Sequence, residues 1–153
     1  MPPSSHSHAP LPDWQAWFDG SCKPNPGQCR IACVIEGPDG FHLNQTASAG
    51  YGDSSHAEYA ALILTMQLLS ASVSHGQRIR IHGDSLVVID DMKQPAHKAS
   101  ALLAAYRQQA QALLNVLPGC ELRWVPRHKN VKADSLLRNL SAPGERTKEI
   151  ANN

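Results

Sequence analysis

The sequence has few charges, few aromatic residues and no long apolar run. Only 18% of its 153 residues are charged and 5% are aromatic, and the formal net charge is +1. This balance does not mark the whole surface as one that binds nucleic acid. No apolar stretch approaches the roughly 18 residues that a membrane span requires, so we expect no membrane partner. With 42% hydrophobic residues, the chain can bury the core of one domain.

Two further classes are disfavoured by what the cysteines and the N-terminus lack. The four cysteines, at positions 22, 29, 33 and 120, form no C-x-x-C pair, so we predict no structural zinc site. The first 13 residues have neither the basic segment nor the apolar core of a secretory signal. We therefore expect a cytoplasmic protein whose thiols stay reduced. Cys33 lies in an apolar run and is expected in the core.

Charge is distributed unevenly along the chain. Residues 1–75 contain two basic and six acidic residues, whereas residues 119–153 contain seven basic and four acidic ones. An acidic first half and a basic C-terminal part are compatible with a metal site beside a phosphate-binding surface. Chance asymmetry explains the same counts, so charge alone leaves both interpretations open.

Hydrophobic periodicity predicts an α/β domain at residues 13–141 between flexible tails at 1–12 and 142–153. The turn-rich segment 20–29 is expected to be a loop. The element order β-β-β-α-β-α-α-β-α predicts a five-stranded mixed sheet, an antiparallel meander plus two further strands, flanked by helices. The predicted strands are 14–19, 31–35, 41–47, 78–82 and 120–125, and the predicted helices are 56–70, 85–92, 98–117 and 131–140.

Four carboxylates stand at strand ends and helix starts, which gather along one edge of an α/β sheet. Asp19 ends the first strand and Asp84 follows the fourth. Glu58 and Asp134 fall in the first turns of two predicted helices. Each also has a local explanation: a turn at Asp19, a capping box from Ser55 to Glu58, an N-cap at Asp84 and a favourable helix dipole at Asp134.

The segments around these acids resemble the active site of a known family. FDGSCKPNPG, HAEYAAL, IHGDS and VPRHKNVKADSLL resemble, in this order, the four active-site segments of type 1 ribonuclease H, over roughly residues 14–140. The resemblance implies the ribonuclease H-like fold and hydrolysis of the RNA strand of RNA–DNA hybrids, leaving 5′-phosphate and 3′-hydroxyl ends. It also implies that Asp19, Glu58, Asp84 and Asp134 hold two Mg²⁺ ions, with Mn²⁺ as an alternative.

The resemblance further implies a set of substrate contacts. The first loop of the family reads RNA 2′-hydroxyl groups, and basic residues near the last carboxylate contact phosphates. Turn chemistry at Asn25 and a solvated basic loop remain the alternatives. His128 either assists proton transfer and product release or is an ordinary loop histidine. The implied substrate-binding residues are Gly20, Ser21, Cys22, Asn25, Ser55, Arg127 and Lys129, with Lys132 as a further phosphate contact.

Several positions depart from the family pattern and predict a weaker grip on substrate. Ser54 and Ser55 replace two asparagines, and Leu86 replaces a glutamine. Asp53 stands near the position of a threonine that helps hold a DNA phosphate, where an acid repels phosphate unless it points away. Residues 93–99 are too few for the basic protrusion of some members, so the chain resembles the short form.

Three other functions are compatible with parts of the sequence. A related nuclease acting on DNA structures needs the same acids, but the first loop suits 2′-hydroxyl readout better. A non-catalytic nucleic-acid or partner-binding module with a weakened site fits the missing polar contacts. A domain with chance motif matches is the third. We expect a monomer whose partner is an RNA–DNA hybrid.

Overall fold

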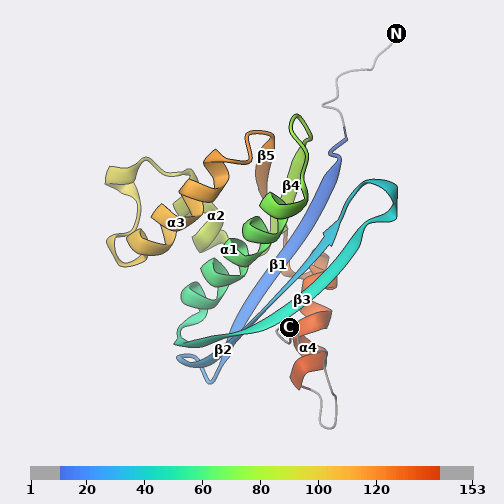
Figure 1. Ribbon diagram of the computed structural model, residues 1–153. Helices are drawn as coiled ribbons and strands as arrows, with labels where there is room; N and C mark the ends of the chain where they lie inside the picture. Colours follow the sequence, from blue (N-terminus) through green and yellow to red (C-terminus); the bar gives the residue numbers. More distant parts are fainter. Residues whose placement is uncertain (1–10, 142–153) are drawn as a thin grey trace.

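The computed structural model describes residues 11–141 (Figure 1). Within this range the elements follow the predicted order β-β-β-α-β-α-α-β-α. The predicted tails lie almost wholly outside the described residues, so the division into tails and domain stays a prediction. The strands are β1 (Trp14–Lys23), β2 (Gly27–Glu36), β3 (His42–Gly52), β4 (Ile79–Gly83) and β5 (Cys120–Trp124), and the helices are α1 (Ser54–Ser72), α2 (Leu86–Lys93), α3 (Ala104–Asn115) and α4 (Val131–Ser141).

The five strands form one mixed sheet in the order β3-β2-β1-β4-β5, which confirms the predicted fold class. β1, β2 and β3 pair antiparallel, and β4 pairs parallel with both β1 and β5. Phe18 of β1 lies opposite Gly83, the last residue of β4. Asp19 and Asp84 directly follow these two residues, so they emerge at the same edge of the sheet.

Helices cover both faces of the sheet (Figure 1). α1 packs on β1 and β2, with α2 and α3 against its outer side, and α4 packs on the opposite face of β1 and β2. Ile31–Ile35 of β2 are all buried, as expected for a strand covered on both faces. Cys33 is completely buried, and burial raises the pKa of its thiol to about 12. Among residues 11–141, no helix is long and apolar enough to span a bilayer.

The turn-rich segment 20–29 is not the predicted loop. β1 continues to Lys23 and β2 begins at Gly27, so only residues 24–26 form the turn. Pro24 and Pro26 have no N–H to donate to a strand partner, and they are confined to this turn. The hairpin extension is completed by pairing of residues 20–23 with residues 28–31.

The predicted helix 98–117 is shorter than its composition suggests. Residues 96–103 form two single 3₁₀ turns, and α3 occupies only Ala104–Asn115. Leu102 is 92% exposed and only Leu103 of residues 96–103 packs against the core, so this stretch has little apolar contact to sustain a longer helix. Ser100 is instead fixed by donating its backbone N–H to Asp91 Oδ1 at 2.8 Å.

Candidate active site

Three of the four predicted carboxylates meet at the sheet edge. Asp19, Glu58 and Asp84 each offer one carboxylate oxygen, and these three atoms lie within 4.8 Å of one another. All three residues line a cavity of about 580 Å³. Asp134, from the first turn of α4, lines the same cavity but is not part of the 4.8 Å cluster. The structure therefore brings together four acids that are separated by up to 115 positions in the chain.

Close packing between β1 and α1 places Glu58 beside Asp19. A Cβ atom on Gly20 would lie 2.5 Å from the carbonyl oxygen of Ala57, so only glycine allows this approach. Glu58 does not form the predicted capping box with Ser55. The N-cap of α1 is Asp53, whose Oδ1 accepts from His56 N at 2.9 Å, and the helix therefore begins at Ser54.

The same N-cap explains the unexpected acid at position 53. One oxygen of its carboxylate accepts from the backbone of α1, and Asp53 does not line the cavity. At the next helix the cap is Ser85, not Asp84, because Val88 N donates to Ser85 Oγ at 3.3 Å. The Asp84 carboxylate is therefore not used as a helix cap, and it lines the cavity instead.

Burial and mutual repulsion control protonation in the cluster. Asp19 is only 6% exposed, and burial, followed by the negative charges of Asp84 and Asp134, raises its pKa to about 7. The Gly20 N–H, which donates to Asp19 Oδ1 at 3.0 Å, and the Arg127 charge act in the opposite direction. Burial, then the charges of Asp19 and Asp84, raises the pKa of Glu58 well above its usual value.

These features fit a divalent cation. Glu58 Oε1 is buried and has no hydrogen-bond partner, although buried polar atoms in folded proteins are normally paired. A hard cation ligated by carboxylate oxygens satisfies such an atom and offsets the repulsion between the acids. The donor set is therefore able to hold a metal ion, with oxygen ligands contributed by β1, α1 and the residue after β4.

Two arginines lie among the acids. Arg138 Nη2 donates to Asp134 Oδ2 at 2.7 Å, an i,i+4 pair on α4. Arg127 lines the same cavity and favours the charged form of Asp19. Because Arg138 is 76% exposed, its ion pair contributes little to stability. The cavity thus combines a buried acidic floor with positive charge at its rim.

Part of the predicted substrate-binding set lines the cavity. Gly20, Ser21 and Asn25 do so, and Ser54 does so in place of the predicted Ser55. Asn25 Nδ2 donates to Ser54 Oγ at 3.2 Å, and Ser54 N donates to Asn25 Oδ1 at 3.0 Å. These two bonds tie the β1–β2 turn to the start of α1. Their role toward substrate stays a prediction.

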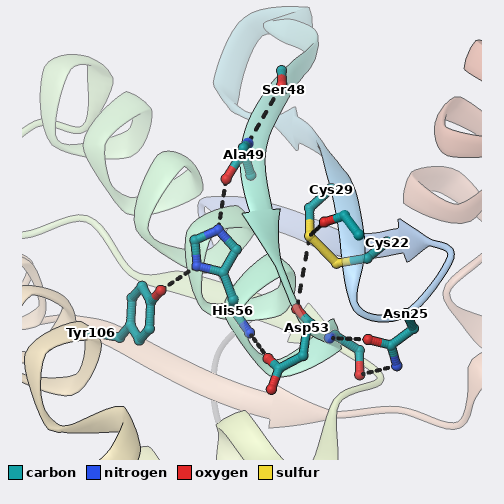
Figure 2. The surroundings of a disulfide bond; sticks show 11 residues. Cys22, Asn25, Cys29, Ser48, Ala49, Asp53, His56 and Tyr106 are labelled. Carbon is teal, nitrogen blue, oxygen red and sulfur yellow. Dashed lines mark hydrogen bonds between the residues drawn. A yellow bond between two sulfur atoms is a disulfide. The ribbon is translucent and has the colours of Figure 1, made fainter.

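Cys22 lines the cavity too, but its sulfur is not a free thiol. Cys22 and Cys29 lie directly opposite each other in the β1–β2 pair and form a disulfide (Figure 2). The expectation that all four cysteines stay reduced is therefore wrong for these two. Its cause is the loop prediction for residues 20–29, since two extended strands bring the side chains together. Any contact of Cys22 with substrate is left to its backbone.

The basic loop before α4 is only partly directed at the cavity. Arg127, His128 and Lys129 form a 3₁₀ turn, and His128 lines a neighbouring hollow shared with Arg127 and Asp134. Lys129 is exposed and lines neither hollow. Lys132 lies elsewhere: its Nζ donates to Glu36 and sits 4.2 Å from the Trp17 ring centroid. The structure therefore does not support Lys132 as a phosphate contact.

Sequence reasoning missed several residues of the site. Lys23 and Arg138 line the cavity, and Asn130 contacts Asp84 from the start of α4. The i,i+4 spacing of Asp134 and Arg138 is a recognisable helix pair, so this partner was detectable. Lys23 was not identified because residues 20–29 were predicted to form a loop rather than the end of a strand. Asn130 lies in the segment VPRHKNVKADSLL that carries the family resemblance, but its contact with Asp84, 46 positions away, was not predicted.

The similarity of the chain to known proteins agrees with this geometry. A family model described as reverse transcriptase-like matches residues 17–139. The chain belongs to this family. A ribonuclease HI of Halobacterium salinarum is 29% identical over 123 residues, which are 79% of this chain and 60% of that protein. The chain thus spans 60% of the length of this relative. The resemblance to type 1 ribonuclease H is confirmed.

Solved structures of this family share the fold. The crystal structure of RNase H1 from Halobacterium salinarum has a TM-score of 0.71 and 27% identity, covering 80% of this chain and 92% of that one. The N-terminal RNase H domain of a Mycobacterium tuberculosis protein gives 0.67 and 25%, with 80% and 94% coverage. A compost-derived RNase H1 in complex with RNA/DNA hybrid gives 0.69 and 24%, with 80% and 92% coverage, and shows the likeness of fold alone.

Proposed function

We propose that this family member is a metal-dependent endonuclease that hydrolyses the RNA strand of RNA–DNA hybrids. The observation that carries the proposal is the cluster of buried Asp19 and Glu58 with half-buried Asp84, whose carboxylate oxygens lie within 4.8 Å of one another. The RNA/DNA hybrid bound by the compost-derived RNase H1 supports the choice of substrate class. The expected products carry 5′-phosphate and 3′-hydroxyl ends.

The three clustered acids, completed by Asp134, would hold two Mg²⁺ ions, and Mn²⁺ is expected to replace them. When bound, the ions supply a nucleophilic water at neutral pH and stabilise the departing 3′ oxygen. Asp19 is the acid whose ionisation both Asp84 and Asp134 oppose, which makes it the candidate to serve both ions. Full ionisation of these acids is then favoured by the cations rather than by the protein.

The remaining residues of the cavity would position the substrate. Gly20 and Ser21 would approach RNA 2′-hydroxyl groups, which distinguish RNA from DNA. Arg127 would contact a phosphate of the bound strand. Arg138 would exchange its pair with Asp134 for a phosphate once Asp134 ligates a cation. His128, which lines the neighbouring hollow with Arg127 and Asp134, would move a proton or assist release of the product.

The cellular location and the oligomeric state of the protein are proposed from its sequence. We infer a cytoplasmic protein acting as a monomer. Because disulfides are rare in the cytosol, the Cys22–Cys29 disulfide is the feature that argues against a cytoplasmic location. Mass determination of the protein after its thiols are alkylated in cell lysate under denaturing conditions, which expose the buried Cys33, would decide it. A mass showing two alkylated cysteines supports persistence of the disulfide, and four alkylated cysteines support a fully reduced protein.

The proposed activity is tested with an end-labelled RNA–DNA hybrid, with and without Mg²⁺ or Mn²⁺. Single-stranded RNA, duplex RNA and duplex DNA serve as alternative substrates. Asp84→Asn removes a cluster carboxylate, and Asp91→Asn changes a buried acid outside the site. We expect metal-dependent cutting of the hybrid's RNA strand alone, abolished only by Asp84→Asn. A folded protein that cuts nothing with either metal would instead be a non-catalytic binding module.

A further inference from the structure

One buried side chain connects the parts of the chain that carry the acids. Asn130, at the start of α4, is completely buried. Its Nδ2 donates to the carbonyl oxygen of Phe18 at 2.9 Å and to Asp84 Oδ2 at 3.1 Å. Its backbone carbonyl oxygen accepts from Asp134 N at 3.1 Å. Phe18 immediately precedes Asp19, so a single residue is bonded to three acid-bearing segments.

The chemistry of its partners fixes the orientation of this amide. The Phe18 carbonyl and the Asp84 carboxylate are both acceptors, so only the NH₂ group of Asn130 can face them. Both of its N–H groups are used in these two bonds. Its Oδ1 is left buried without a partner. A side chain that kept an oxygen unpaired in the interior, at a cost, is better explained by what its two donors hold than by packing.

We infer that Asn130 is a positioning residue that sets the metal affinity of the carboxylate cluster by fixing Asp84 relative to Asp19. This inference rests on the metal site of the proposed function, but not on the hybrid as substrate. The bond to Phe18 O anchors the amide to the end of β1. The bond to Asp84 Oδ2 then engages one oxygen of the carboxylate, so that the other is left without this bond to ligate a cation. Residues that orient metal ligands in this way change metal affinity about 10–100-fold when they are replaced.

Two replacements separate this role from a packing role. Asn130→Leu keeps the branched shape of the side chain but has no N–H to donate. Asn130→Ala opens a space next to two acceptors, where a water molecule can donate to both. A positioning role therefore predicts that leucine weakens metal binding more than alanine does. A packing role predicts the opposite order, because alanine leaves the larger cavity.

The measurement is calorimetric titration of each metal-free variant with Mg²⁺ alone, with folding checked by circular dichroism. We expect Asn130→Leu to weaken Mg²⁺ binding at least about tenfold, and Asn130→Ala to weaken it less. Asp91→Asn is the control, since it disturbs a buried acid of α2 outside the cluster. The inference is overturned if leucine changes the affinity less than about threefold, or if alanine is the weaker binder.

The remaining outcomes also decide. Should Asn130→Leu fail to fold, Asn130→Ala must still weaken Mg²⁺ binding more than Asp91→Asn does, or the inference is wrong. If the native protein binds Mg²⁺ and the predicted order holds but no hybrid is cut, the proposed function fails while this inference stands. If the native protein binds neither Mg²⁺ nor Mn²⁺, both fail.

Discussion

Two buried aspartates of this protein have the same exposure and opposite surroundings. Asp19 and Asp91 are each 6% exposed. Asp91 has a partner for each oxygen: Tyr59 Oη donates to Oδ2 at 2.5 Å, and Ser100 N donates to Oδ1 at 2.8 Å. Arg107 Nε closes the network by donating to the Asp91 carbonyl oxygen at 3.1 Å. This network is complete within the protein.

The surroundings of Asp19 remain incomplete. Only the adjacent Gly20 N–H donates to its carboxylate among the hydrogen bonds of the described residues, while the charges of Asp84 and Asp134 oppose its ionisation. Glu58 Oε1 next to it has no partner at all. Burial of an acid is therefore not in itself a sign of function. The sign is a group of neighbouring acids whose buried members, Asp19 and Glu58, have fewer donors than Asp91 has.

The largest expected effect separates the two aspartates by activity. Asp19→Asn should lower the rate of hybrid cleavage at least about 1000-fold, because it removes a carboxylate that would ligate the catalytic ions. Asp91→Asn should leave the rate within about threefold at 25 °C. Asp91 lies outside the cluster and therefore does not stabilise the charge that develops in the transition state. Single-turnover cleavage with saturating Mg²⁺ measures both. Equal losses in the two variants would contradict the distinction.

The next effect concerns pH and stability. Because folding raises the pKa of Asp19 from 3.8 to about 7, the folded state binds the proton more tightly than the unfolded state does. The contribution of Asp19 to the free energy of unfolding is fully present below about pH 4 and is lost as the pH rises through about 7. The loss amounts to at most about 4 kcal/mol. We expect urea unfolding in EDTA to show it, and Mg²⁺ to restore stability at pH 7.5.

Asp19→Asn is the control for this pH dependence, because it removes the titrating carboxylate. The metal-free variant should be more stable than the native protein at pH 7.5 and should lose less stability between pH 4 and pH 7.5. Asp91→Asn should keep the native pH dependence. A native protein whose metal-free stability rises steadily over this range would show that the cluster is not strained by its charge.

Reduction of the disulfide tests the hairpin that carries Asp19. The bond between Cys22 and Cys29 closes a loop with a sequence separation of 7, and its loss should lower the free energy of unfolding by about 2–3 kcal/mol. Urea unfolding of the metal-free protein with and without dithiothreitol measures this change. A Cys22→Ser/Cys29→Ser variant should show no further effect of the reductant. Equal stability of the oxidised and reduced native protein would contradict the prediction.

The smallest effect belongs to the complete network. Tyr59→Phe removes the hydroxyl group that donates to Asp91 and should destabilise the fold by about 1–3 kcal/mol, nearer the lower bound because Asp91 keeps its bond from Ser100. The Mg²⁺ affinity should not change, since Tyr59 lies on the α2 and α3 side of α1. Thermal unfolding and metal titration of one preparation measure both. A large fall in metal affinity would show that the two regions are coupled.

Much of the fold was predictable because local patterns and tertiary packing agree. The apolar run Ile31–Ile35 is buried as a central strand, and the helical spacing from Ala57 to Leu69 forms the buried face of α1. The four acids line one cavity as expected, because Asp19 and Asp84 follow Phe18 and Gly83, which are paired across the parallel strands β1 and β4. Their roles in catalysis and substrate binding stay predictions.

The misses arose where long-range contacts decide the local structure. The glycines and prolines of residues 20–29 predicted a loop, but pairing with β2 extends β1 to Lys23. Cys22 and Cys29 flank the Pro-Asn-Pro turn and pair across the hairpin, and two cysteines flanking a tight turn were the signal for the disulfide. The cap of α1 lies at Asp53 rather than Ser55, so Ser54 rather than Ser55 reaches the cavity.

The central claim is that Asp19, Glu58 and Asp84 form a site completed by a divalent cation. It is tested most directly by titrating the metal-free protein with Mg²⁺ at pH 6.5 in two buffers with different ionisation enthalpies. Because ligation requires deprotonated acids, binding should release protons, and the observed heat should differ between the buffers. Asp84→Asn should abolish this signal and Asp91→Asn should retain it. Binding without proton release, or the same signal in all three proteins, would contradict the claim.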